Sequence, residues 1–65
     1  MDAKQAVEWA QQVYKNNYQE NWSTDFCLWF QFSLRDYALA GFPNGEHLVG
    51  HSKWTKENGT EYKGE

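Results

Sequence analysis

The sequence predicts an α+β fold in which one N-terminal helix packs on an antiparallel sheet of three or four strands. Three observations predict it. Apolar residues recur with helical spacing over residues 2–19, they alternate strictly over residues 26–34, and Asn-Gly pairs stand at residues 44–45 and 58–59. A chain of 65 residues has room for one small domain, which we take to be residues 1–65. The alternative fold is a helical hairpin followed by a C-terminal β-hairpin.

The N-terminal segment shows the period of an amphipathic helix over about residues 3–19. Its apolar face consists of Ala3, Ala6, Val7, Ala10, Val13, Tyr14 and Tyr18. Asp2 precedes this face and Gln5 follows three residues later, which is the spacing of a capping box. We therefore predict a helix that begins after Asp2 and ends before Asn21.

The middle segment admits two interpretations. In residues 26–34 one parity is entirely apolar, with Phe26, Leu28, Phe30, Phe32 and Leu34, which predicts a strand. The alternative is a helix from Ser23 to Ala40, which Ser23 or Thr24 could cap and which Gly41 and Pro43 could end.

On that helix, Leu28, Phe32 and Leu39 would form a second apolar stripe that needs its own partner. The strand leaves fewer apolar groups exposed, so we prefer it. The predicted core then joins two sets of side chains, which are Phe26, Phe30 and Leu34 from the strand and Val7, Ala10 and Tyr14 from the helix.

The C-terminal third resembles a β-hairpin in its turn residues. Asn44-Gly45 and Asn58-Gly59 suit type I′ turns, which need two residues with positive φ. After the second turn, residues 60–62 could pair back on residues near Trp54. Trp54 and Tyr62 are then predicted to meet across the strands.

Charge and composition weaken several classes of function. The net charge of −3 argues against contacts with the nucleic-acid backbone, which usually require a cationic surplus. The single cysteine, Cys27, excludes an internal disulfide and favours a cytoplasmic location. No stretch approaches the roughly 18 apolar residues of a membrane span, so no membrane contact is expected.

The sequence also argues against an enzyme, a metal site or a cofactor. His47 and His51 could be joined by Glu46 and Cys27 around a metal, but Pro43 and Gly50 argue against a helix presenting both histidines. Cys27 with a histidine as base lacks any sign of proximity. The five glycines are dispersed, so no phosphate-binding loop is present.

What remains is a non-enzymatic protein-binding function, of the adaptor or inhibitor type, through an aromatic surface. Four Trp and four Tyr are more large rings than so small a core hides, and these residues dominate interfaces. On the strand, Trp29 points away from the apolar face. The predicted binding residues are Trp29, Gln31, Arg35, Trp22 and Trp9, and the partner is another protein or, in a homodimer, a second copy.

The alternative function is binding of single-stranded nucleic acid by the predicted C-terminal hairpin. Rings beside lysines can stack bases, and the candidate residues are Trp54, Tyr62, Lys53, Lys56 and Lys63. Nearby acidic residues weaken this hypothesis.

Overall fold

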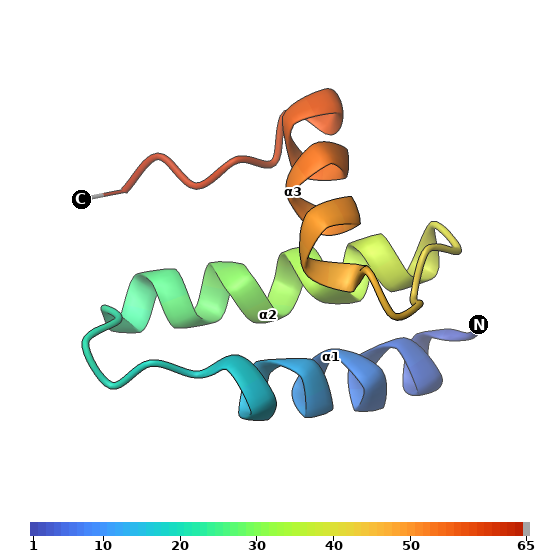
Figure 1. Cartoon of the computed structure of the whole chain (residues 1–65), viewed down its shortest axis with the longest axis horizontal. Coiled ribbons are helices and arrows are strands. Elements are labelled where there is room, and N and C mark those ends of the chain that lie inside the picture. Colours follow the sequence, from blue (N-terminus) through green and yellow to red (C-terminus); the bar gives the residue numbers. More distant parts are fainter. Residues whose placement is uncertain (65) are drawn as a thin grey trace.

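The computed structural model describes residues 1–64 and contains three helices, α1 (Ala3–Asn17), α2 (Thr24–Leu39) and α3 (His47–Asn58). No strand occurs in this part of the chain, so the predicted α+β fold is wrong. The helical hairpin of the alternative fold is present, whereas its C-terminal β-hairpin is not. Figure 1 shows α1 and α2 side by side, α3 set across the C-terminal half of α2, and the last residues running back along the N-terminal half of α2.

The helix α1 confirms the sequence prediction, although it ends at Asn17 rather than near residue 19. Both hydrogen bonds of the capping box are present: the Gln5 N–H donates to Asp2 Oδ1 at 2.8 Å, and the Asp2 N–H donates to Gln5 Oε1 at 3.1 Å. At the other end, the Asn17 side chain donates to the Val13 carbonyl at 2.8 Å. Local signals at both ends therefore set the length of this helix.

The middle segment forms the helix α2, so the predicted strand over residues 26–34 is wrong. The Ser23 hydroxyl accepts the Phe26 N–H at 3.1 Å and caps the first turn, with Asp25 at the positive end of the helix dipole. The helix ends at Leu39, and Gly41, just after the C-cap residue Ala40, turns the chain with a φ of 96° that favours glycine. These are the caps that the rejected helical interpretation identified.

The C-terminal third forms the helix α3, and the predicted hairpin is wrong there as well. Gly59 does have positive φ, 70°, but it ends a helix instead of turning a hairpin. The Thr60 N–H donates to the Thr55 carbonyl, which is the longer of the two bonds of a Schellman motif, and the Gly59 N–H donates to the same carbonyl. At the start, Asn44 accepts the Glu46 N–H in an Asx turn.

The core lies between α1 and α2 and is closed by the start of α3. Its buried apolar residues are Ala6, Ala10, Val13, Phe30, Leu34, Tyr37 and Ala38. The small alanines of α1 let the two helices approach closely, and Phe30 and Leu34 fill the space between them.

Most of the predicted core is confirmed, with one exception. Ala10, Phe30 and Leu34 are buried, and Tyr14 and Phe26 are half-buried against them. Val7, however, is 37% exposed, because α2 rather than a wide sheet lies against α1.

The helix α3 is held by polar groups and by a close approach. Its buried residues are His51 and Thr55, and the His51 ring contacts Ser33 Oγ of α2 at 2.7 Å. At Gly50 an added Cβ would overlap the Tyr37 hydroxyl, so only glycine lets α3 cross α2 at this depth. Within residues 1–64, no helix is both long and apolar enough to cross a bilayer.

Candidate functional site

The outward side of α2 carries a second row of large apolar side chains. Leu28, Phe32 and Leu39 are 49%, 53% and 44% exposed. Together with Arg35 they are spaced by four, three and four residues, so they share one side of the helix. We call Leu28, Phe32, Arg35 and Leu39 the outer stripe. Its three apolar residues are the second stripe that the sequence analysis expects on a helical middle segment, and that stripe is the reason why the strand is preferred there.

Arg35 is positioned beside the ring in the centre of the outer stripe. Its Cζ atom lies 5.2 Å from the centroid of the Phe32 ring, within the range of a cation–π contact. Its guanidinium also lies 3.1 Å from Asp36 Oδ1, and both side chains remain partly exposed, 38% and 44%. Such an ion pair adds little stability, but it balances the charge that Arg35 brings to an apolar surface.

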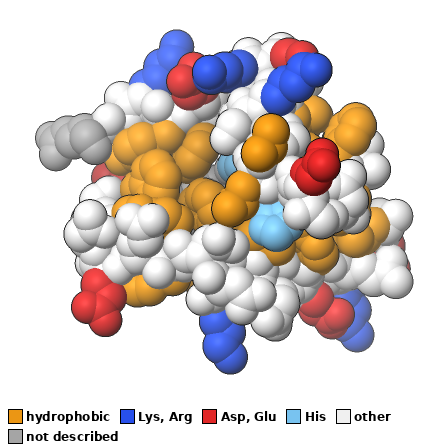
Figure 2. Space-filling model, in the orientation of Figure 1, with side chains coloured by type: hydrophobic (Ala, Val, Ile, Leu, Met, Phe, Trp, Pro, Cys, Tyr) orange, Lys and Arg blue, Asp and Glu red, His pale blue; other side chains and the backbone are white. Residues whose placement is uncertain are grey.

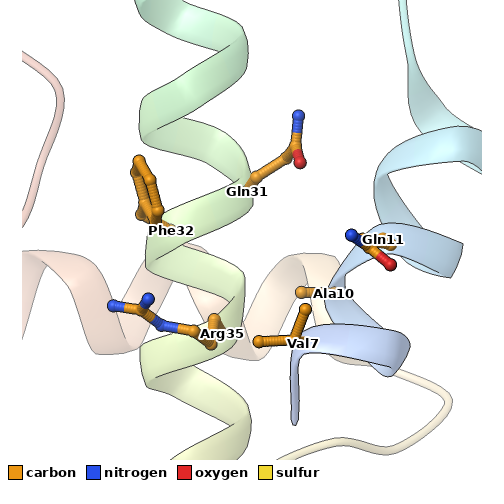
Figure 3. Close-up of a pocket in the computed structure, with 6 residues that line it drawn as sticks. All are labelled: Val7, Ala10, Gln11, Gln31, Phe32 and Arg35. Carbon is orange, nitrogen blue, oxygen red and sulfur yellow. The ribbon is translucent and has the colours of Figure 1, made fainter. Parts of the chain in front are cut away.

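A shallow groove of about 140 Å³ borders the outer stripe on the side of α1. It is lined by Val7, Ala10 and Gln11 of α1 and by Gln31, Phe32 and Arg35 of α2. In Figure 3, Gln31 leans from α2 towards α1, while the Phe32 ring and the Arg35 guanidinium lie on the side of α2 away from α1. The stripe and the groove thus form one continuous surface with an apolar centre and amide groups at its edge.

The structure brings together only two of the five predicted binding residues. Gln31 and Arg35 line the same groove. The three tryptophans are half-buried and lie apart from it, against other rings. Of the residues that line this groove, the sequence prediction includes Gln31 and Arg35 and omits Phe32.

Trp29 lies under the C-terminal segment. Its Nε1–H donates to the Thr60 carbonyl at 2.5 Å, and its ring lies 5.6 Å from that of Tyr62. Beside it is an open hollow of about 320 Å³ between α2, α3 and residues 61–62. The strand parity that singled out Trp29 does not exist on a helix, so that argument for a central role in binding is lost.

Trp22 and Trp9 cover the two ends of the core. The Trp22 ring lies 5.0 Å from Phe30 and 4.8 Å from Phe26. The Trp9 ring lies 6.2 Å from Tyr37 and meets His47 edge-on at 5.8 Å. Both tryptophans have a structural reason to be large.

The residues proposed to bind nucleic acid do not form one platform. Trp54 of α3 packs on Tyr37, at 6.1 Å, whereas Tyr62 packs edge-on against Phe26, at 5.2 Å. Lys53, Lys56 and Lys63 are exposed. Figure 2 shows positive and negative side chains mixed along the end of α3, with apolar surface below them. The predicted cross-strand contact of Trp54 with Tyr62 is therefore wrong, since no hairpin joins them.

Ser33 and His51 form a buried pair, with Ser33 Oγ 2.7 Å from His51 Nε2, while the Ser33 hydroxyl donates to the Phe30 carbonyl at 3.2 Å. Both residues are buried, so the pair as it stands offers no surface to a substrate. Burial lowers the pKa of His51, and the nearby His47 lowers it further. A neutral imidazole that bonds Ser33 across two helices accounts for the pair as a link between α2 and α3.

The two histidines do lie on one helix, contrary to the argument from Pro43 and Gly50. His51 is engaged with Ser33, and His47 Nδ1 lies 3.2 Å from the Asn44 carbonyl. Within residues 1–64, no three His, Cys, Asp or Glu side chains converge as a metal site would require.

Cys27 is a half-buried free cysteine near Tyr14 of α1. Hydrogen bonding with the Cys27 side chain raises the pKa of Tyr14 to about 12, and burial contributes to the shift. Both residues lie near the Trp22 end of the core, where the Tyr14 ring is 6.5 Å from that of Trp22.

Comparison with protein-family models, with characterised proteins and with solved structures gives no match. The candidate site therefore rests on the geometry of the chain itself.

Proposed function

We propose that this protein acts by binding a protein partner through the outer stripe of α2, with no catalytic step of its own. The observation that supports the proposal is the exposure of Leu28, Phe32 and Leu39 on one side of a helix whose other side already fills the core. Exposed apolar residues are common singly, but a row at helical spacing is the pattern by which a helix docks in a groove.

Folding gives no reason for these three side chains. Glutamine or lysine would support the helix as well as phenylalanine does, and would be better hydrated. Gln11 and Gln31, in the groove beside the stripe, supply a polar border of the kind that surrounds the centre of an interface. The arrangement of an apolar centre inside a polar border thus supports a contact surface.

The expected affinity is moderate. Burying the remaining half of each of the three side chains contributes roughly 2–4 kcal/mol in total. Association costs at least about 4 kcal/mol in lost translation and rotation. The outer stripe alone is therefore insufficient, and the partner must also contact the groove beside Val7 and Gln31.

The test is capture of partners by the tagged protein, with bound chains identified by mass spectrometry. Phe32→Gln removes the centre of the stripe without changing charge, and Val49→Gln is its control, because Val49 is 76% exposed on α3, away from the stripe. We expect Phe32→Gln to lose a partner that the control retains, with both variants as stable as the parent. Equal capture by both variants would show that binding does not use this face.

A further inference from the structure

We propose that the hollow between α2, α3 and the C-terminal segment binds a small molecule that carries a methylated ammonium group. The hollow measures about 320 Å³, near the lower end of the range for ligand pockets. None of the outer-stripe residues lines it, so this site is separate from the proposed protein contact. Two features of its lining support the proposal, a wall of aromatic rings and a single charged side chain, which is acidic.

Three aromatic rings form one wall of the hollow. The ring centroids of Phe26 and Trp29 are 5.3 Å apart, and that of Tyr62 is 5.2 Å from the first and 5.6 Å from the second. At these distances the rings touch, so a cation lies on their common surface rather than between them. All three are half-buried, and a methylated ammonium that covers them gains cation–π attraction as well as apolar contact. Figure 2 shows apolar side chains gathered over the N-terminal half of α2, where the last residues run.

The Trp29 ring is held in place without a ligand. Its Nε1–H donates to the Thr60 carbonyl at 2.5 Å, and its centroid lies 5.9 Å from that of His51. The polar group of the indole is thus already used, which leaves the ring as the part that a ligand can contact. Because the ring is fixed beforehand, binding costs little side-chain entropy there.

The charges around the hollow favour a cation. Among the described residues that line it, Glu61 is the one with a formal charge at pH 7, and it is exposed. His51 lines the hollow too, but burial lowers its pKa, so the imidazole is neutral at pH 7. The net charge of −3 on the whole chain adds to the attraction for a cation and repels an anion.

Two other hollows contain aromatic rings, and each already holds a cation. In the groove beside the outer stripe, Arg35 lies 5.2 Å from the Phe32 ring. The hollow of about 210 Å³ beside Trp54 is lined by Lys53 as well as Glu57, so its charges cancel. A cationic ligand is therefore expected at the hollow beside Trp29 in preference to these two.

A methylated ammonium suits this lining better than a primary amine does. A primary ammonium is strongly hydrated and loses more on leaving water, whereas methyl groups spread the charge and contact the rings directly. Leu48, on the α3 side, adds an apolar contact. Because the hollow is open, the rest of the molecule extends into solvent and affinity is low. We expect a dissociation constant on the order of 1 mM.

The experiment is an NMR titration of the whole isotope-labelled chain with choline, up to about 20 mM so that a millimolar site fills. It is read at the Trp29 indole N–H, which Trp29→Phe assigns. The neutral control is the alcohol that has carbon in place of the choline nitrogen. We expect choline to shift the Trp29 signal, its own methyl protons to move upfield over the rings, and the alcohol to bind about tenfold more weakly.

Two charge variants test the acidic side chain. Glu61→Gln removes it, and Glu8→Gln, at an exposed position of α1, changes the net charge equally. We expect Glu61→Gln to weaken choline about threefold at low salt and to leave the alcohol unchanged, while Glu8→Gln binds like the parent. Tyr62→Ala should weaken both ligands and leave the helices intact by circular dichroism, because Tyr62 lies outside them.

A Trp29 indole signal that does not move at the highest choline concentration overturns the inference, as does equal affinity for the neutral alcohol. Equal losses in Glu61→Gln and Glu8→Gln would mean that choline responds to net charge alone, and the inference fails. It fails as well if Tyr62→Ala binds choline like the parent. None of these results bears on partner capture by Phe32→Gln, so the proposed function stands or falls separately.

Discussion

Replacing Gly50 with alanine tests how closely α3 crosses α2. In the interior of a helix this change normally stabilises a protein by about 1 kcal/mol, because alanine has the higher helix propensity. Here the new Cβ would overlap the Tyr37 hydroxyl, and Tyr37 is buried, so the ring has little room to withdraw. Overpacking of this kind costs about 1–3 kcal/mol. We therefore expect Gly50→Ala to change stability by between zero and a loss of about 2 kcal/mol, with no gain.

The second variant, Tyr37→Phe, removes the overlapping oxygen. The nearest remaining atom, Cζ, would then lie 3.3 Å from the new Cβ, a tight contact but a tolerable one. In this background Gly50→Ala should recover the normal gain, so the double-mutant cycle should give a coupling energy of about 1–3 kcal/mol. Thermal unfolding followed at 222 nm measures it, since 1 kcal/mol shifts the Tm of so small a domain by about 4–8 °C.

Ser52→Ala provides the control for helix propensity, because Ser52 is exposed on the same helix. It should stabilise by up to about 0.5 kcal/mol in both backgrounds. If Gly50→Ala stabilises the parent as much as it stabilises Tyr37→Phe, α3 does not cross α2 at Gly50 and the described packing is wrong.

Three further perturbations test the core, the buried histidine and the C-terminal segment. Phe30→Ala should lower the free energy of unfolding by about 3–5 kcal/mol, which is much of the roughly 3–10 kcal/mol expected for a chain of 65 residues. The circular dichroism of this variant should therefore show a largely unfolded chain. A Tm within a degree or two of the parent would place Phe30 outside the core. Burial lowers the pKa of His51 in the folded state, so the unfolded chain takes up the proton first as the pH falls. The free energy of unfolding should therefore decrease as the pH drops through about 6.5, the pKa of an unperturbed histidine, and level off below the folded pKa. His51→Gln should flatten that slope, and an imidazole NMR titration at or above 6.5 in the folded protein would contradict the assignment. Trp29→Phe removes the donor to the Thr60 carbonyl, so it should lower the free energy of unfolding by about 0.5–1.5 kcal/mol and speed amide exchange in residues 60–64. Unchanged exchange in those residues would mean that this hydrogen bond does not hold the C-terminal segment.

The helix α1 could be predicted because every signal for it is local. The capping box of Asp2 and Gln5, the helical period and the polar face all lie within residues 2–17, and no distant contact is needed to predict the helix. The residues that cap α2 could also be predicted from local sequence. Ser23 and Gly41 stand where the alternative interpretation placed its start and stop.

The helix α3 could not be predicted because it buries the wrong kinds of residue. Its inward positions are His51 and Thr55, while Leu48 and Val49 are exposed, so the period of the apolar residues carries no signal. Gly50 disfavours a helix by its propensity, but because it has no Cβ it lets α3 approach Tyr37 closely. Both features depend on α2, and a pattern within residues 46–59 does not contain them.

The prediction of a strand over residues 26–34 depends on how much apolar surface a strand hides, and that criterion is incomplete. Leaving an apolar side chain exposed costs nothing relative to the unfolded chain, in which it is also exposed. A strand, however, needs neighbours for its backbone N–H and C=O groups, whereas a helix pairs them internally. The rest of this chain offers little to build a sheet, since Leu48 and Val49 are the only apolar residues of residues 44–53.

One covering face is enough for a helix, and α1 supplies it with Ala6, Ala10 and Val13. Folding thus requires only the inner side of α2 to be apolar. The apolar residues on its outer side, Leu28 and Phe32 above all, are surplus to what the single chain uses. Apolar residues that folding does not need, at the spacing of a helix–helix contact, are best explained by a contact outside the chain. The same apolar alternation over residues 26–34 that favours a strand in the sequence thus supports a binding face on the helix.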